Sequence, residues 1–173
     1  LRSVLTQLDS DSISMNGENQ NFSYNYTFSD SNQNGSIALS MLAIDSAGNQ
    51  SDTIINRVYF DKTAPQLSSI LEGSIIEDKV YSRFGDSLQL AWSKVELESG
   101  IKRSYIGLGS DSGLVDVVNW ITSGNEDQGS LTALNLDNNS KYFGAIFLED
   151  NVGNISDSIW GDGITIDLEV PNV

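Results

Sequence analysis

Short runs in which apolar and polar residues alternate are the strongest pattern along the chain. The clearest lie at 22–28, 37–43, 88–92 and 142–148, where every second residue is apolar, aromatic or glycine. A period of two residues indicates β-strands. The connecting segments, such as 30–35, are rich in Gly, Asn, Asp and Ser, which favour turns. No stretch keeps a helical period over three turns, so the sequence predicts an all-β fold.

An internal repeat organises the chain. Residues 45–52 (DSAGNQSD) recur in altered form at 150–157 (DNVGNISD), an offset of 105 residues. A second pair of segments follows each copy, ending at Pro65 and Pro171, at an offset of 106. Two patterns in the same order indicate a repeating unit of the size of an immunoglobulin-like sandwich. We therefore expect residues 1–63 to be the C-terminal part of a truncated or short Ig-like sandwich.

Residues 64–173 are expected to form a complete β-sandwich. They contain the run Leu88-Gln-Leu-Ala-Trp92, with Trp92 as a core residue, and the segment 136–142, in which Leu, Ser and Tyr recur at fixed spacing. With these motifs the unit resembles a fibronectin type III domain, whose second strand is similar to the run 88–92. The segment 136–142 matches the tyrosine corner of that family, and the segment 61–65 is similar to junctions in tandem Ig-like repeats of large bacterial surface and secreted proteins. Residues 1–20 fit no strand of the family.

This resemblance implies tandem Ig-like or fibronectin type III-like β-sandwiches, the first of them incomplete. It further implies an extracellular or bacterial cell-surface location, with neighbouring repeat domains of the same chain as partners.

The repeated motifs have structural explanations. Asp45 and Asp150 each end a strand, where a carboxylate can accept the backbone N–H groups of the following turn. Gly48 and Gly153 are expected at the positive-φ position of that turn. The hydroxyl of Tyr142 is expected to tie the start of its strand to the preceding loop.

Composition and charge exclude several functions. Lys and Arg number 9 against 24 Asp and Glu, which gives a net charge of −15. This balance argues against nucleic acid and anionic membrane surfaces as partners. No apolar run approaches the length that inserts into a membrane. Cys and His are both absent from the sequence, which removes thiolate nucleophiles, Cys/His zinc sites and the commonest general base.

Calcium is the metal that an acidic chain of this kind favours, because hard cations prefer oxygen ligands. In this type of sandwich, the loop carrying Glu96 and Glu98, the turn at Asp150 and the linker carrying Asp61 lie at one end. These four carboxylates are the candidate ligands of a calcium ion that stiffens the domain junction. The alternative is that they are solvated turn and rim residues.

Two tryptophans are candidates for binding carbohydrate. Trp120 and Trp160 have no evident core partner in the strand pattern, and sugars stack on exposed aromatic rings. The alternative is that both are half-buried residues at the edge of a sandwich. A glycan site here would favour an accessory region of a secreted glycoside hydrolase.

Catalysis is not expected in this chain. Glu96 and Glu98 could in principle act as an acid and base, but they lie in a short loop without sign of an enclosing pocket. The sequence is therefore interpreted as a non-catalytic spacer or adhesive-stalk module of a large extracellular bacterial repeat protein.

Overall fold

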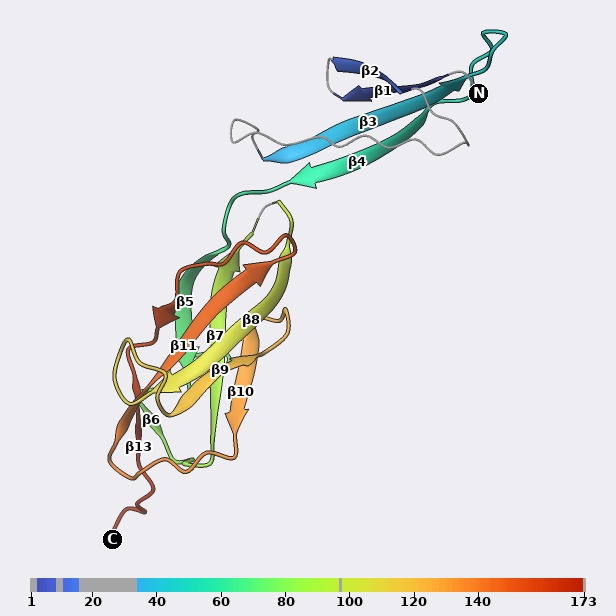
Figure 1. The fold of residues 1–173 in the computed structure, drawn as a ribbon. Coiled ribbons are helices and arrows are strands. Elements are labelled where there is room, and N and C mark those ends of the chain that lie inside the picture. Colours follow the sequence, from blue (N-terminus) through green and yellow to red (C-terminus); the bar gives the residue numbers. More distant parts are fainter. Residues whose placement is uncertain (1–2, 9–10, 16–33, 97, 173) are drawn as a thin grey trace. The chain divides into compact units, whose positions relative to one another are not determined.

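All the regular structure that the computed structural model describes is β-strand (Figure 1). The described residues are 3–8, 11–15, 34–96 and 98–172. Within these ranges no helix is long and apolar enough to cross a membrane. The chain divides into two compact units, Leu1–Lys62 and Thr63–Val173. The predicted all-β fold is confirmed.

The strands of the first unit are β1 (Ser3–Leu8), β2 (Asp11–Met15), β3 (Gly35–Ile44) and β4 (Ile54–Phe60). Those of the second unit are β5 (Gln66–Glu72), β6 (Tyr81–Ser82), β7 (Ser87–Val95), β8 (Ile101–Gly109), β9 (Val118–Thr122), β10 (Gln128–Thr132), β11 (Lys141–Asp150), β12 (Ile159–Trp160) and β13 (Ile164–Ile166).

The second unit is a sandwich of two sheets. One sheet has the order β10-β7-β5, and the other has the order β6-β13-β11-β8-β9, with β12 paired to β11. Alternate residues of β7 enter the core, among them Leu88, Leu90 and Trp92, and they join Ile146 and Leu148 from β11 in one cluster. Trp92 is only 4% exposed. The alternation predicted for these two strands therefore marks their buried faces.

Tyr142 forms the predicted tyrosine corner at the start of β11. Its ring is buried, and its hydroxyl accepts a hydrogen bond from the backbone N–H of Asp137, at 3.0 Å. The bond fixes the loop before β11 to the strand itself. Asn139 in this loop has φ = 60°, a left-handed conformation that Asn adopts more readily than most residues.

The chain enters and leaves the second unit at opposite ends of β11. The side-chain amide of Asn154, just beyond β11, donates to the carbonyl of Thr63, at 3.3 Å. At the other end, the backbone N–H of Leu168 donates to Oδ1 of Asn138, at 2.8 Å. The ten residues of β11 lie between these contacts and span about 33 Å. Figure 1 shows β5 beginning at one end of the second unit and β13 lying toward the other end.

The first unit contains one described sheet, with the order β2-β1-β3-β4. The same order occurs in the second unit. There β9, β8 and β11 correspond to β2, β1 and β3, and β12 and β13, which both pair with β11, correspond to β4. Antiparallel pairing places Ile37 opposite Val58 and Met41 opposite Ile54, so these apolar residues share a face. Val58 is 40% exposed, whereas Ile164, which the repeat aligns with it, is fully buried. The apolar face of β3 and β4 is therefore much less covered than its counterpart.

Residues 1–20 differ from the sequence-based expectation, which assigned no strand there. The structure places β1 and β2 in this segment, in the positions that β8 and β9 occupy in the second unit. Strands of five or six residues carry little alternation, and pairing with β3 supplies the hydrogen bonds that define them. The strand predicted at 22–28 lies outside the described residues.

Candidate functional site

The turn that follows β11 is organised by the carboxylate of Asp150. Oδ1 accepts from the backbone N–H groups of Val152, Gly153 and Asn154, at 2.7–2.9 Å. Oδ2 accepts from the side-chain amide of Asn154, at 2.7 Å. Ser156 completes the turn, because its hydroxyl accepts from the N–H of Leu148 and donates to a backbone carbonyl. The carboxylate of Asp150 thus stabilises the tight turn that it begins.

The turn that follows β3 repeats this network. Asp45 accepts from the backbone N–H groups of Ala47 and Asn49, and from the side-chain amide of Asn49, at 2.7–2.9 Å. Ser51 takes the place of Ser156, accepting from the N–H of Ala43. Gly48 has φ = 93° and Gly153 has φ = 97°, as the sequence predicted. The repeated motif therefore encodes a strand-ending turn.

Hydrogen bonds keep both aspartates ionised. The side-chain amide of Asn49, followed by the N–H groups of the turn, lowers the pKa of Asp45. Burial alone raises the pKa of Asp150, but the bonds from Asn154, Val152 and Gly153 outweigh it, so the pKa lies below its ordinary value. The negative charge at each position is therefore compensated within its own turn.

The predicted calcium ligands divide between the two units. Asp61 lies in the first unit, whereas Glu96, Glu98 and Asp150 lie in the second. Oε1 of Glu96 accepts from the backbone N–H of Glu98, at 3.0 Å, and Glu98 itself is exposed. Asp150 uses both oxygens in its own turn. Calcium binding by these residues stays a prediction.

A buried acidic residue that the sequence analysis missed lies at the end of β5. Glu72 is fully buried, and its carboxylate joins the two sheets of the sandwich. Oε1 accepts from the N–H of Gly144 in β11, at 2.5 Å, and Oε2 accepts from the N–H of Gly163, at 2.6 Å. A side chain at Gly161 would clash with this carboxylate. The glycines therefore permit the close approach of backbone to Glu72.

Two further acids lie beside Glu72. Carboxylate oxygens of Glu72, Asp78 and Asp162 lie within 4.8 Å of one another. Burial raises the pKa of Glu72 most, the N–H groups of Gly144 and Gly163 oppose this, and the charges of Asp78 and Asp162 raise it further. One feature of the sequence could have located Glu72. It follows the core residue Ile70 by two positions in an apolar strand, so the two side chains lie on the same face.

Trp120 in β9 and Trp160 in β12 are half-buried, and both belong to the sheet that contains β11. Trp120 packs edge-on against Phe147, with ring centroids 4.8 Å apart, and Phe147 stacks on Tyr105. The indole N–H of Trp160 donates to the carbonyl of Leu114, at 3.1 Å. Both rings therefore have partners within the second unit. Carbohydrate binding by the two tryptophans stays a prediction.

The second unit has the fold of a fibronectin type III-like, Ig-like module. Solved structures similar to this chain are of that kind. The fibronectin(III)-like modules of CbhA from Clostridium thermocellum match with a TM-score of 0.50 and 13% identity, over 99% of this chain and 82% of theirs. The FN1-FN3 domains of chicken CNTN1 match with a TM-score of 0.53 and 12% identity, over 94% of this chain and 55% of theirs.

Domains of titin give a third match, with a TM-score of 0.51 and 13% identity, over 95% of this chain and 54% of theirs. Neither a protein-family model nor the sequence of a curated protein matches the chain. At these identities the likeness concerns the fold alone, and the fold is that of fibronectin type III-like modules.

Proposed function

We propose that this chain is a non-catalytic spacer region of a large extracellular bacterial repeat protein, where it forms part of a stalk that carries an adhesive or catalytic part. The observation that carries the proposal is the position of the two chain ends in the second unit. The chain enters beside Asn154 and leaves beside Asn138, with β11 between them. Each module of this kind therefore adds its own length to a series.

The energetic basis of a spacer is a core that each module completes for itself. In the second unit, residues from both sheets form one buried cluster. Such a module unfolds as a unit and transmits force between its ends without help from its neighbours. The high negative charge, −15 over the chain, keeps a surface-exposed array soluble. The absence of Cys agrees with a sandwich whose core, without disulfides, supplies its stability.

The first test measures the distance between the ends of the second unit. Because the chain has no native cysteine, paired labels can be introduced as Gln66→Cys with Val170→Cys. A spacer gives a narrow distribution of distances on the order of 30 Å or more, from the rise per residue of β11. The matched control pair, Gln66→Cys with Val152→Cys, places both labels where the chain enters and gives a clearly shorter distance.

The second test applies force to the two ends of the chain. Unfolding of the second unit is expected as one cooperative step, with a gain in contour length on the order of 350 Å from the reach of an extended chain. A broad distance distribution between the labels, or extension without a discrete step, contradicts the spacer proposal.

A further inference from the structure

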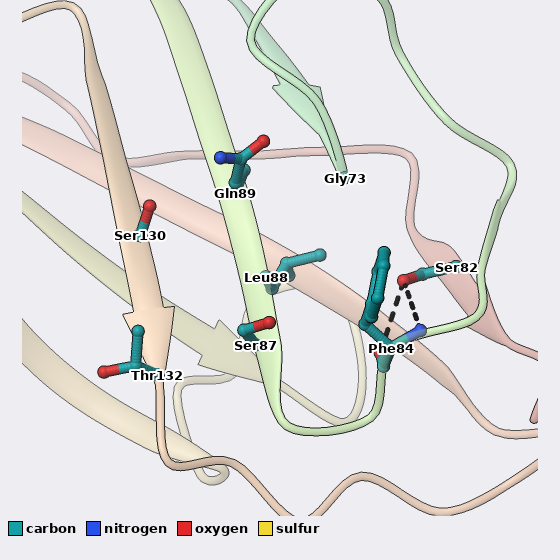
Figure 2. Close-up of a pocket in the computed structure, with 8 residues that line it drawn as sticks. All are labelled: Gly73, Ser82, Phe84, Ser87, Leu88, Gln89, Ser130 and Thr132. Carbon is teal, nitrogen blue, oxygen red and sulfur yellow. Dashed lines mark hydrogen bonds between the residues drawn. The ribbon is translucent and has the colours of Figure 1, made fainter.

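The outer face of the β10-β7-β5 sheet carries a hollow of about 380 Å³ (Figure 2). Its floor is made of Ser87 and Gln89 from β7 and of Ser130 and Thr132 from β10, and Phe84 stands at its edge. This volume lies near the lower limit of about 300 Å³ that is usual for small-molecule sites. The hollow belongs wholly to the second unit and is separate from the acidic residues and tryptophans considered above.

Strand pairing arranges the four polar side chains as a grid. Gln89 lies opposite Ser130, and Ser87 lies opposite Thr132. Neighbours along one strand are about 7 Å apart and partners across the strands about 5 Å apart. The intervening Leu88 is buried in the core, so the polar side chains of β7 face outward. The grid is therefore fixed by the register of the sheet.

Three of the four side chains of this grid have no hydrogen-bond partner among the described residues. Gln89, Ser130 and Thr132 make no side-chain hydrogen bond to any described residue, whereas the hydroxyl of Ser87 donates to Asp86, at 3.1 Å. Hydroxyl and amide groups both donate and accept hydrogen bonds. A ligand that offers alternating donors and acceptors, as vicinal hydroxyl groups do, matches this surface.

Phe84 supplies an apolar surface beside the polar grid. Phe84 as a whole is 53% exposed, although its backbone is held in place by hydrogen bonds. The hydroxyl of Ser82 accepts from the N–H of Phe84, at 3.1 Å, and donates to its carbonyl, at 3.2 Å. The guanidinium of Arg83 lies 4.9 Å from the ring centroid. An aromatic ring next to hydrogen-bonding groups suits a pyranose, which has an apolar C–H face and polar edges.

The charge of the hollow narrows the class of ligand. None of its lining residues is ionisable, and the two charges beside them are single and opposite: Arg83 at the ring of Phe84 and Asp86 at the hydroxyl of Ser87. A cation would require several carboxylates in the lining, and an anion would require more than one guanidinium and would be repelled by a chain of net charge −15. A neutral, hydroxyl-rich ligand meets neither difficulty.

The same face continues along β7. A second hollow, of about 430 Å³, is lined by residues of the same three strands, including Ser69, Ser93 and Gln128, and by the acidic residues Glu126 and Asp127 just before β10. Positions 87, 89, 91 and 93 alternate with core residues and so lie in one row. Both hollows therefore lie along the outer face of β7, with the buried Ala91 between Gln89 and Ser93.

We infer that the outer face of β7 and β10 binds a neutral polysaccharide, with the ring of Phe84 packing on one sugar and Gln89, Ser130 and Thr132 hydrogen-bonding its hydroxyls. This site gives the module an attachment function in addition to spacing.

The test is a titration of the isotope-labelled 173-residue chain with hexasaccharides of neutral glucan, xylan, mannan and galactan, followed by NMR. At least one of them is expected to produce saturable shifts of the backbone amides of Ser87, Gln89, Ser130 and Thr132. Phe84→Ala and Gln89→Ala each weaken this binding about tenfold, by loss of ring packing or of hydrogen bonds. Tyr81→Ala, an exposed aromatic outside the hollow, leaves the affinity unchanged.

Three results overturn the inference. One is the absence of saturable shifts with every sugar at about 10 mM, where even a site of millimolar Kd is largely filled. Another is a set of shifts that maps to Trp120 and Trp160, which instead supports the platform predicted from the sequence. The third is equal affinity for wild type, Phe84→Ala and Gln89→Ala. Unchanged core amide shifts in each variant confirm that it is folded.

Discussion

The side-chain amide of Asn154 lies 2.7 Å from Oδ2 of Asp150, and the same contact at the same distance joins Asn49 to Asp45. Two segments 105 residues apart thus build one hydrogen-bond network twice. The motif consists of a carboxylate that ends a strand and an amide four residues later that locks it. It is a structural device, and its removal gives the first prediction.

Asp150→Ala is expected to destabilise the second unit by about 3 kcal/mol, because it leaves several N–H groups of a tight turn without an acceptor. Thermal or urea unfolding measures this loss. Asp157→Ala is the control, since that residue is exposed and its side chain has no hydrogen bond to the described residues. Its effect is expected within about 0.5 kcal/mol. Equal effects of the two substitutions would contradict the assigned role.

The contribution of Asp150 also depends on pH. Its pKa is lowered in the folded state, so its contribution is complete above the ordinary value of 3.8 and is lost as the pH falls through the folded pKa. The stability difference between wild type and Asp150→Ala is therefore expected to shrink below pH 4. A stability difference that increases as the pH falls would contradict the lowered pKa of Asp150.

Tyr142→Phe removes only the hydroxyl that accepts from the N–H of Asp137. The expected loss is about 1–2 kcal/mol, since the ring still packs in the core while a backbone N–H loses its acceptor. Tyr81→Phe is the matched control, because Tyr81 is exposed. Chemical unfolding compares the two variants, and an unchanged stability of Tyr142→Phe would show that the corner is dispensable.

The raised pKa of Glu72 predicts that stability depends on pH in the opposite direction. Because its pKa is raised in the folded state, the folded state binds the proton more tightly, and stability falls as the pH rises from 4.5 through the folded pKa. Glu72→Gln lacks this titration. The stability of wild type minus that of Glu72→Gln is therefore expected to decrease between pH 4 and pH 7.

The control for this measurement is Glu126→Gln, which removes an exposed carboxylate. Its stability is expected to stay parallel to that of wild type over the same range. A wild-type advantage over Glu72→Gln that increases with pH would mean that the N–H groups of Gly144 and Gly163 outweigh burial.

Calcium is expected to raise the melting temperature of the chain more than magnesium or added sodium chloride does, by mass action on the folded state. Glu98→Gln is expected to reduce the effect, and Glu126→Gln is expected to leave it intact. Equal responses to calcium, magnesium and salt would end the prediction. A response lost in Asp78→Asn but retained in Glu98→Gln would place the ion beside Glu72 instead.

The exposed apolar face of β3 and β4 predicts binding of a hydrophobic dye by the first unit. The double variant Ile54→Ser/Val58→Ser is expected to lower dye fluorescence markedly, since these residues are 61% and 40% exposed. The melting temperature of the second unit is expected to stay unchanged. Dye fluorescence that is insensitive to the double variant would assign the apolar surface elsewhere.

Local sequence patterns were sufficient to predict most of the fold. Alternation located β3, β7 and β11, and short motifs located the turns at Asp45 and Asp150 and the corner at Tyr142. Each of these features depends on residues that are near one another in sequence, so the sequence displays them directly. The strands β1 and β2 were missed, because their pairing with β3 defines them more than their own composition does.

The sites were less accessible to sequence reasoning than the fold. Glu72 meets Gly144 and Gly163 across the sandwich, and nothing near Glu72 in the sequence announces those partners. The polar grid likewise requires the register that sets Gln89 opposite Ser130. The sequence determined the strands, the turns and the repeat, because these follow from hydrophobic period and local hydrogen bonding. Which side chains meet between strands follows from register and sheet packing, because these join residues that are far apart along the chain.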